Sequence, residues 1–170
     1  MVDPRADYKQ RRIDGTTGQL MALTVAVLIS PLVVAALAIY CLIGMLLHVV
    51  VWCWWCPRGR DMLFVYSNSP IWQEYVQQQL LPPLETRAVV LNWSERRNWR
   101  PSLAVWAFRY FGGSRAYNPI AIVFRPLRRT RTFRFYEPFH DLKHGKPERV
   151  ERMTSELFAA IGEGAQTGSR

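Results

Sequence analysis

The stretch that decides the fold of this chain runs from Leu20 to Trp55 and reads LMALTVAVLISPLVVAALAIYCLIGMLLHVVVWCWW. It lies within a longer run, Gly15 to Pro57, that contains no Asp, Glu, Lys or Arg. A helix of about 20 apolar residues crosses the ~30 Å hydrocarbon core of a bilayer, so this stretch exceeds one crossing. A secretory signal peptide has a shorter apolar region, about 7–15 residues, before a small-residue cleavage site. The pattern therefore predicts a retained membrane anchor.

Ser30-Pro31 divides the apolar stretch into two unequal parts. Residues 32–52 are long enough to span a bilayer, whereas residues 19–30 are too short. One interpretation is a single transmembrane helix kinked at Pro31, because an interior proline removes a backbone donor and crowds the preceding turn. The other is a re-entrant hairpin with both ends on one side. The single span is the favoured reading.

Basic residues flank the apolar stretch on both sides: Arg5, Lys9, Arg11 and Arg12 before it, and Arg58 and Arg60 after it. Their excess at the N-terminus favours a cytoplasmic N-terminus. A single span then places the C-terminal domain outside the cytoplasm, and a hairpin places it inside. We expect a membrane location, of the bacterial inner-membrane type, with the side of the domain left open.

The sequence has 170 residues, a net charge of +9 and a pI of about 10.0, which fits one domain with extensions. We divide it into a polar, flexible N-terminal tail (1–18), a membrane segment (19–56), a soluble domain (61–162) and a flexible C-terminal tail (163–170). All three cysteines lie in the membrane segment, so the soluble domain has no internal disulfide framework.

Short apolar runs in the soluble domain predict four strands, at 62–66, 88–93, 120–124 and 132–136. The last two are close enough in sequence to form an antiparallel hairpin.

Helical spacing of apolar residues predicts three helices between and after these strands. The first begins at Pro70, with the Ser69 hydroxyl as its N-cap, and ends at Pro82-Pro83. The second covers 102–111. The third runs from about Pro147 to Ile161, ends at Gly162 and Gly164, and buries a stripe formed by Val150, Met153, Leu157 and Ile161.

This order of elements, βαβαββα, is similar to the minimal thioredoxin-like fold, and the resemblance covers about residues 61–162. The turn Ser69-Pro70-Ile71-Trp72 stands where glutaredoxin-like and thioredoxin-like members carry a Cys-x-x-Cys pair. Asn118-Pro119-Ile120 resembles the segment whose cis-proline faces that pair. The resemblance implies an α/β fold, a cis bond before Pro119, and a partner-binding groove formed by Ser69, Pro70, Trp72 and Pro119.

The chain departs from that family at the two positions that carry its chemistry. Ser69 and Trp72 replace the cysteines, and thiol–disulfide exchange requires a thiolate. The redox activity of the family therefore does not transfer to this domain. A Rossmann-like or flavodoxin-like nucleotide site is the fold alternative, but the turn after the first strand, Ser67 to Pro70, has no glycine to admit phosphate.

Cys53-Trp54-Trp55-Cys56 is a true Cys-x-x-Cys motif, and such motifs can support redox chemistry. It lies at the end of the apolar stretch, where Trp52, Trp54 and Trp55 resemble an interfacial aromatic belt. We favour inert packing for these cysteines and keep a redox, metal or lipid-modification role as the alternative.

Arginines cluster around the turn of the predicted hairpin, at Arg125, Arg128, Arg129 and Arg131. Nucleic-acid binding would need interleaved exposed aromatics, and strand alternation assigns Phe133 and Phe135 to the core instead. For a membrane-tethered domain, the nearer anionic partner is the lipid headgroup layer.

His140 and His144 are a weak metal signal, because Gly145 and Pro147 predict a loop and no further ligands accompany them. His48 lies near the end of the apolar stretch and fits the membrane interface. No cofactor, metal or nucleic acid is expected. We expect a non-catalytic, protein-binding subunit or assembly factor of a membrane complex. The alternatives are a thiol oxidoreductase that uses Cys53 and Cys56, and a domain that binds anionic lipid.

Overall fold

The computed structural model describes residues 4–113, 118–125 and 128–167. The chain forms two compact units, Met1–Gly44 and Met45–Arg170. Helix α1 (Pro4–Trp55) begins in the first unit and ends in the second, and the other described elements belong to the second unit.

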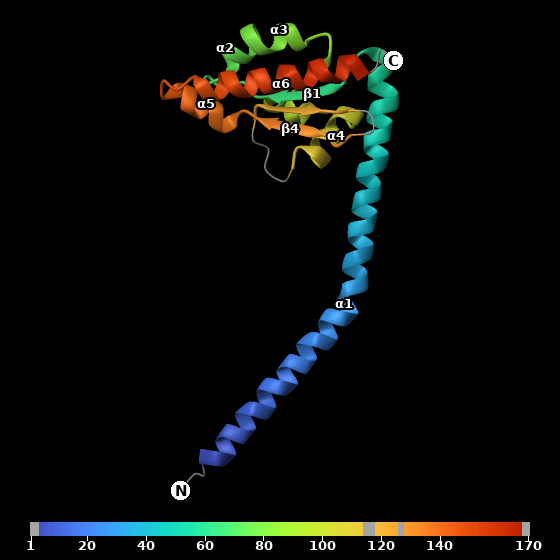
Figure 1. The fold of residues 1–170 in the computed structure, drawn as a ribbon, viewed down its shortest axis with the longest axis vertical. Helices are drawn as coiled ribbons and strands as arrows, with labels where there is room; N and C mark the ends of the chain where they lie inside the picture. The colour runs from blue at the N-terminus through green and yellow to red at the C-terminus, as the bar shows by residue number, and fades with distance from the viewer. Residues whose placement is uncertain (1–3, 114–117, 126–127, 168–170) are drawn as a thin grey trace. The chain divides into compact units, whose positions relative to one another are not determined.

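Helix α1 is unbroken and contains Pro31 (Figure 1). The single helix predicted from the sequence is confirmed, and the re-entrant hairpin is wrong. The helix begins at Pro4, where we had expected a flexible tail, because each residue added to an existing helix gains a backbone hydrogen bond. Within α1, the segment that starts at Leu23 is long and apolar enough to cross a membrane.

The serine before Pro31 explains how the helix tolerates a proline. Pro31 has no N–H, so the carbonyl of Val27, four residues earlier, loses its usual helical donor. The hydroxyl of Ser30 donates to this carbonyl at 3.3 Å. Such local replacement of a missing backbone donor is one of the ways in which an apolar helix accommodates proline.

The second unit contains a four-stranded mixed sheet with the order β2-β1-β3-β4. Strand β1 (Met62–Tyr66) pairs in parallel with β2 (Ala88–Asn92) and antiparallel with β3 (Ile120–Val123), and β3 pairs antiparallel with β4 (Arg131–Arg134). The four strands and the hairpin predicted from the sequence are confirmed. Asn118-Pro119 is cis, as predicted.

Helices cover both faces of this sheet, and Figure 1 shows α3 and α4 on opposite sides. One face carries α2 (Gln73–Tyr75), the π-helical η2 (Val76–Leu80), α3 (Leu81–Leu84), α5 (Tyr136–Lys143) and α6 (Glu148–Thr167). The other face carries α4 (Leu103–Phe111), which Ser102 caps by accepting from the Val105 N–H at 3.4 Å. Two short 3-10 segments, η1 (Cys56–Arg58) and η3 (Trp93–Asn98), complete the described elements.

The helix after β1 does not stop at Pro82-Pro83, as the sequence had indicated. The backbone switches to a π-helical turn before the prolines, which then occupy the first turn of α3. Proline is tolerated in a first turn because the N–H groups there have no intrahelical partner.

Two further helix boundaries differ from those predicted. Residues 136–143 form helix α5, although a strand end and a loop were expected there. Helix α6 continues past Gly162 and Gly164 to Thr167. Its predicted stripe is confirmed in position, since Val150, Leu157 and Ile161 are buried and Met153 is half-buried.

The last turns of α1 form part of the core of the second unit. Val51 is fully buried and Trp55 packs edge-on against Phe124, with 5.7 Å between ring centroids. His48 lies between Phe111 and Phe124, and its Nε2 is 3.1 Å from the Arg125 carbonyl oxygen. The expected tryptophan belt is therefore wrong for Trp55, which turns inward, whereas Trp54 remains exposed.

Two arginines fasten α6 to the sheet. Arg125 donates through Nη2 to the Ala160 carbonyl at 2.8 Å, and Arg87 donates through Nη1 to the Ile161 carbonyl at 3.1 Å. Arg87 also forms an ion pair with Asp61, with 3.2 Å from Nε to Oδ1. Burial raises the pKa of Asp61 above the usual aspartate value, and the Arg87 guanidinium offsets part of that rise.

Candidate binding site at the turn between β1 and α2

The turn that follows β1 is shaped by backbone hydrogen bonds. The carbonyl of Ser69 accepts from the N–H groups of Trp72 and Gln73, at 3.2 and 2.9 Å. Helix α2 has its N-cap at Trp72, with no side-chain cap hydrogen bond. The predicted N-cap at Ser69 is therefore wrong, because residues 70–72 form a turn before the helix begins.

The side chain of Trp72 lies between the turn and helix α5. Its side chain is 8% exposed and packs near Tyr136 and Phe139, with ring centroids 6.0 and 6.2 Å away. The indole Nε1 donates to the carbonyl of Ser67 at 3.2 Å. The position that the family resemblance assigns to the second cysteine thus holds a buried, hydrogen-bonded aromatic ring.

A polar cluster ties the turn to the end of β2. The Asn68 N–H donates to Ser94 Oγ at 2.9 Å, and Asn92 Nδ2 donates to Asn68 Oδ1 at 3.0 Å. Asn92 also donates to Glu95 Oε1 at 3.1 Å and accepts from the Ser94 N–H. The sequence analysis missed these residues, although the ends of neighbouring parallel strands are a usual place for binding groups. Their polar atoms bond to one another and stiffen the turn.

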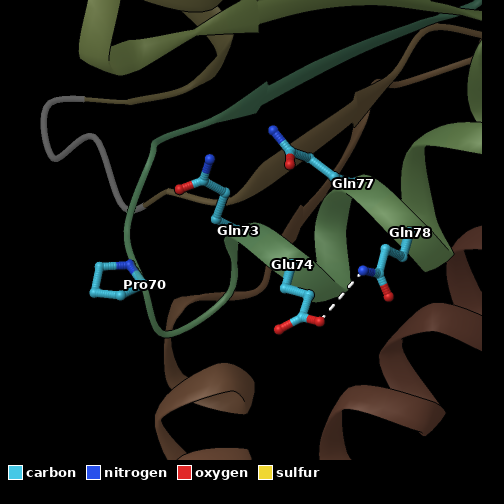
Figure 2. A pocket seen from close by; sticks show the side chains of 5 residues that line it. All are labelled: Pro70, Gln73, Glu74, Gln77 and Gln78. Atoms are coloured by element: carbon cyan, nitrogen blue, oxygen red, sulfur yellow. Dashed lines mark hydrogen bonds between the residues drawn. The ribbon is translucent and has the colours of Figure 1, made fainter.

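Two surface hollows meet at Pro70. The larger, about 480 Å³, is lined by Pro70, Ile71, Leu142 and Lys143. The smaller, about 370 Å³, is lined by Pro70, Gln73, Glu74, Gln77 and Gln78. Figure 2 shows Gln73 and Gln77 on one side of the helical segment formed by α2 and η2, and Glu74 and Gln78 on the other. Gln78 Nε2 donates to Glu74 Oε1 at 3.2 Å. Pro70 therefore borders two hollows, one lined mainly by apolar side chains and one lined mainly by polar side chains.

Of the residues predicted to form a groove, Pro70 lines both hollows and Trp72 is buried beside the turn. Pro119 is not among the residues that line these two hollows. Pro119 is buried, and its carbonyl accepts from the Phe135 N–H at 2.8 Å. The outer wall of the apolar hollow comes instead from Leu142 and Lys143 of α5, the helix that the sequence analysis did not predict.

Cys53 and Cys56 lie at the carbonyl end of α1 and in η1. Both are free thiols, with Cys53 exposed and Cys56 half-buried. The carbonyl end of a helix disfavours negative charge, so the helix does not stabilise a thiolate here. Next to them, the Arg58 guanidinium lies 4.2 Å from the centroid of the Trp54 ring.

The four arginines predicted to contact lipid have different environments. Arg125 is 8% exposed and bonded to α6, so its charge is directed into the protein. Arg128, Arg129 and Arg131 are exposed, and the Arg131 guanidinium lies 5.2 Å from the centroid of Phe133. The sequence signal did not distinguish the structural arginine from the solvated ones.

His140 and His144 lie at the end of α5, with 4.8 Å between ring centroids. The predicted loop is wrong at His140, which is helical. Within the described ranges, no group of three or more His, Cys, Asp or Glu side chains is placed to hold a metal ion. The neighbouring Asp141 pairs with Arg149 at 2.6 Å, and this hydrogen bond lowers the pKa of Asp141.

No protein-family model, curated protein or solved structure matches this chain. The structure shows an α/β domain with a mixed four-stranded sheet, joined to a long apolar helix.

Proposed function

We propose that this chain is a membrane-anchored, non-catalytic domain of thioredoxin-like fold. It binds a segment of a partner protein as a subunit or assembly factor of a membrane complex. The sheet order β2-β1-β3-β4, with helices on both faces, supports the fold assignment. The apolar character and length of α1 support the anchor.

The observation that carries the non-catalytic assignment is the burial of Trp72. A thiol enzyme of this fold needs an accessible sulfur at the turn, whereas here a hydrogen-bonded indole fills one position and a serine the other. The apolar hollow beside Pro70 is a described surface next to this turn, and it is lined by Leu142 and by Ile71, which is 39% exposed. It suits a partner segment that inserts an apolar side chain between Ile71 and Leu142.

Site-specific photo-crosslinking in the native membrane tests this proposal. A photoreactive amino acid at Ile71 should crosslink a membrane protein, and one at Gln79, which is exposed outside both hollows, should not. The additional substitution Leu142→Asp should abolish the crosslink from position 71, because it places a charge in the lining of the apolar hollow. Equal crosslinking from both positions would refute the proposed site.

The thiol-oxidoreductase alternative rests on the exposure of Cys53. Replacing Cys53 and Cys56 together with serine separates the two functions. The non-catalytic proposal expects unchanged membrane insertion and unchanged crosslinking from Ile71. Loss of biological function in a variant that still inserts would reject it.

A further inference from the structure

The outer surface of α4 presents a large aromatic side chain that the domain does not use. Ala104, Ala107 and Phe108 face the sheet and are buried, whereas Trp106 is 59% exposed. A single exposed apolar residue is common on soluble proteins and carries no argument alone. The residues around Trp106 indicate which phase or partner this side chain contacts.

The last turns of α1 pack in the same part of the core as α4. Val51 and Trp55 belong to the same core cluster as the inner residues of α4. Trp55 contacts Phe124, which follows β3, but His48, about 10 Å earlier along the helix, also contacts Phe111 at the end of α4. His48 contacts Phe124 as well, so the end of α1 packs beside both the sheet and the end of α4.

The exposed surface of α1 remains apolar up to the domain. Met45, Val49 and Trp54 are 64%, 45% and 59% exposed, although they lie in the same unit as α4. An indole at the boundary between an apolar and an aqueous phase is typical of a headgroup layer. Trp106 is a further exposed indole of the same unit.

Basic groups accompany Trp106 on the same side. Arg109 lies in the last turn of α4 and is exposed. On β4, Phe133 belongs to the core cluster of the other face, so its neighbour Arg134 points to the α4 side. A Cβ placed on Gly113, two residues beyond α4, would lie 3.3 Å from Arg134 Nη2. Positive charge beside an interfacial indole complements anionic phosphate headgroups.

We propose that the α4 face, defined by Trp106, Arg109 and Arg134, lies in the headgroup layer of an anionic bilayer and holds the domain against the membrane surface. This inference rests on the proposed membrane anchor. The occupant is the lipid headgroup layer, because the α4 face combines an exposed indole with exposed arginine side chains, which complement anionic headgroups. A second copy of the chain is the competing occupant.

Spin-label depth measurements test this orientation with the full chain in vesicles of phosphatidylcholine and phosphatidylglycerol. In a background with all three cysteines replaced by serine, single labels are placed through Trp106→Cys, Leu37→Cys and the control Gln79→Cys. The label at 37 should be relaxed more strongly by oxygen than by a water-soluble nickel complex, as expected for a label in hydrocarbon. The label at 106 should show protection from a water-soluble nickel complex, and the label at 79 should show none.

Each outcome has one meaning. If the label at 37 is buried but the label at 106 behaves like the label at 79, the α4 face lies in water and the inference is overturned while the anchor stands. If the label at 37 is in water, the anchor and the inference both fail. Protection at 106 with dipolar broadening that disappears on dilution with unlabelled protein identifies a second copy and also overturns the inference.

A second measurement keeps the native indole. The emission of the Trp106→Phe variant, subtracted from that of the unaltered protein, isolates Trp106. Brominated phosphatidylcholine should quench this difference emission, and more strongly when phosphatidylglycerol is present. Arg109→Gln together with Arg134→Gln should remove the effect of phosphatidylglycerol. Difference emission that brominated lipid leaves unchanged contradicts the proposed position of Trp106.

Discussion

Replacing Trp72 with alanine should cost more stability than any other change at the turn between β1 and α2. The side chain is 8% exposed, so the truncation removes an almost fully buried aromatic ring. Buried Trp→Ala changes typically lower the free energy of unfolding by about 3–5 kcal/mol. About 1 kcal/mol of this belongs to the hydrogen bond from Nε1 to the Ser67 carbonyl, and the rest to packing against Tyr136 and Phe139.

Two matched variants separate these contributions. Trp72→Phe keeps an aromatic ring but removes the hydrogen bond and part of the volume, so we expect a loss of about 1–2 kcal/mol. Trp106→Ala removes the same side chain at a site that is 59% exposed, and surface changes usually stay within about 0.5 kcal/mol. The order of loss should therefore be Trp72→Ala, then Trp72→Phe, then Trp106→Ala.

Native-state hydrogen exchange of the β1 amides measures these losses in the full chain in detergent. Strand β1 lies between β2 and β3, so its amides exchange only when the domain opens. Circular dichroism would be dominated by α1, which contributes no described residue to the core cluster that contains Trp72. A loss below about 1 kcal/mol for Trp72→Ala, or a loss equal to that of Trp106→Ala, would refute the assignment of Trp72 as the structural centre of the turn.

Three further variants test other parts of the structure by the same exchange measurement. Arg87→Met leaves Asp61 buried without its ion pair, so unfolding should be easier by about 1–3 kcal/mol at pH 7. The pKa of Asp61 is raised in the folded state, so the stability of the domain falls as the pH rises above the usual aspartate pKa. Without Arg87 the pKa of Asp61 should rise further, and this fall in stability should become steeper. Equal losses of stability at pH 4 and pH 7 would contradict this expectation. Gly162→Ala should stabilise α6 by about 0.5–1 kcal/mol, because an added Cβ meets no atom within 4 Å and the helix continues beyond it; destabilisation would mean that the helix ends there. His48→Leu should cost about 1 kcal/mol through the lost hydrogen bond to the Arg125 carbonyl, and an unchanged β1 exchange rate would show that α1 is not part of the domain.

The strands could be predicted because each is a short apolar run bounded by polar or proline-containing turns. Buried strands such as β3, with four buried residues, carry this signal strongly. Helix α5 could not be predicted, because Pro138 interrupts its pattern and Gly145 and Pro147 follow closely. Its stability comes from tertiary packing of Phe139 and Pro138, which local sequence does not reveal.

The end of α1 shows a different limit of prediction from sequence. Residues 49–55 are all apolar, so the sequence has no periodicity to separate an outward-facing side from a core-facing side. Only the fold shows that these two side chains turn inward.

At the candidate site, the sequence located the turn after β1 and the helical segment that follows it. The hydrogen bond from the indole to Ser67 and the wall contributed by α5 depend on side-chain geometry and on segments distant in sequence. Neither leaves a local pattern.

The burial of Val51 and Trp55 has a practical consequence for anyone who shortens this protein. A chain that begins at Asp61, where composition places the domain boundary, would lack both side chains and leave Phe124, which packs against Trp55, partly uncovered. Each large apolar side chain contributes about 1.5–3 kcal/mol when buried, which is a large share of the stability of a small domain. A chain that begins at Met45 keeps the core whole, and it also keeps the apolar surface of Met45, Val49 and Val50 exposed to water. Solubility and an intact core therefore place opposite demands on the same eleven residues, 45–55.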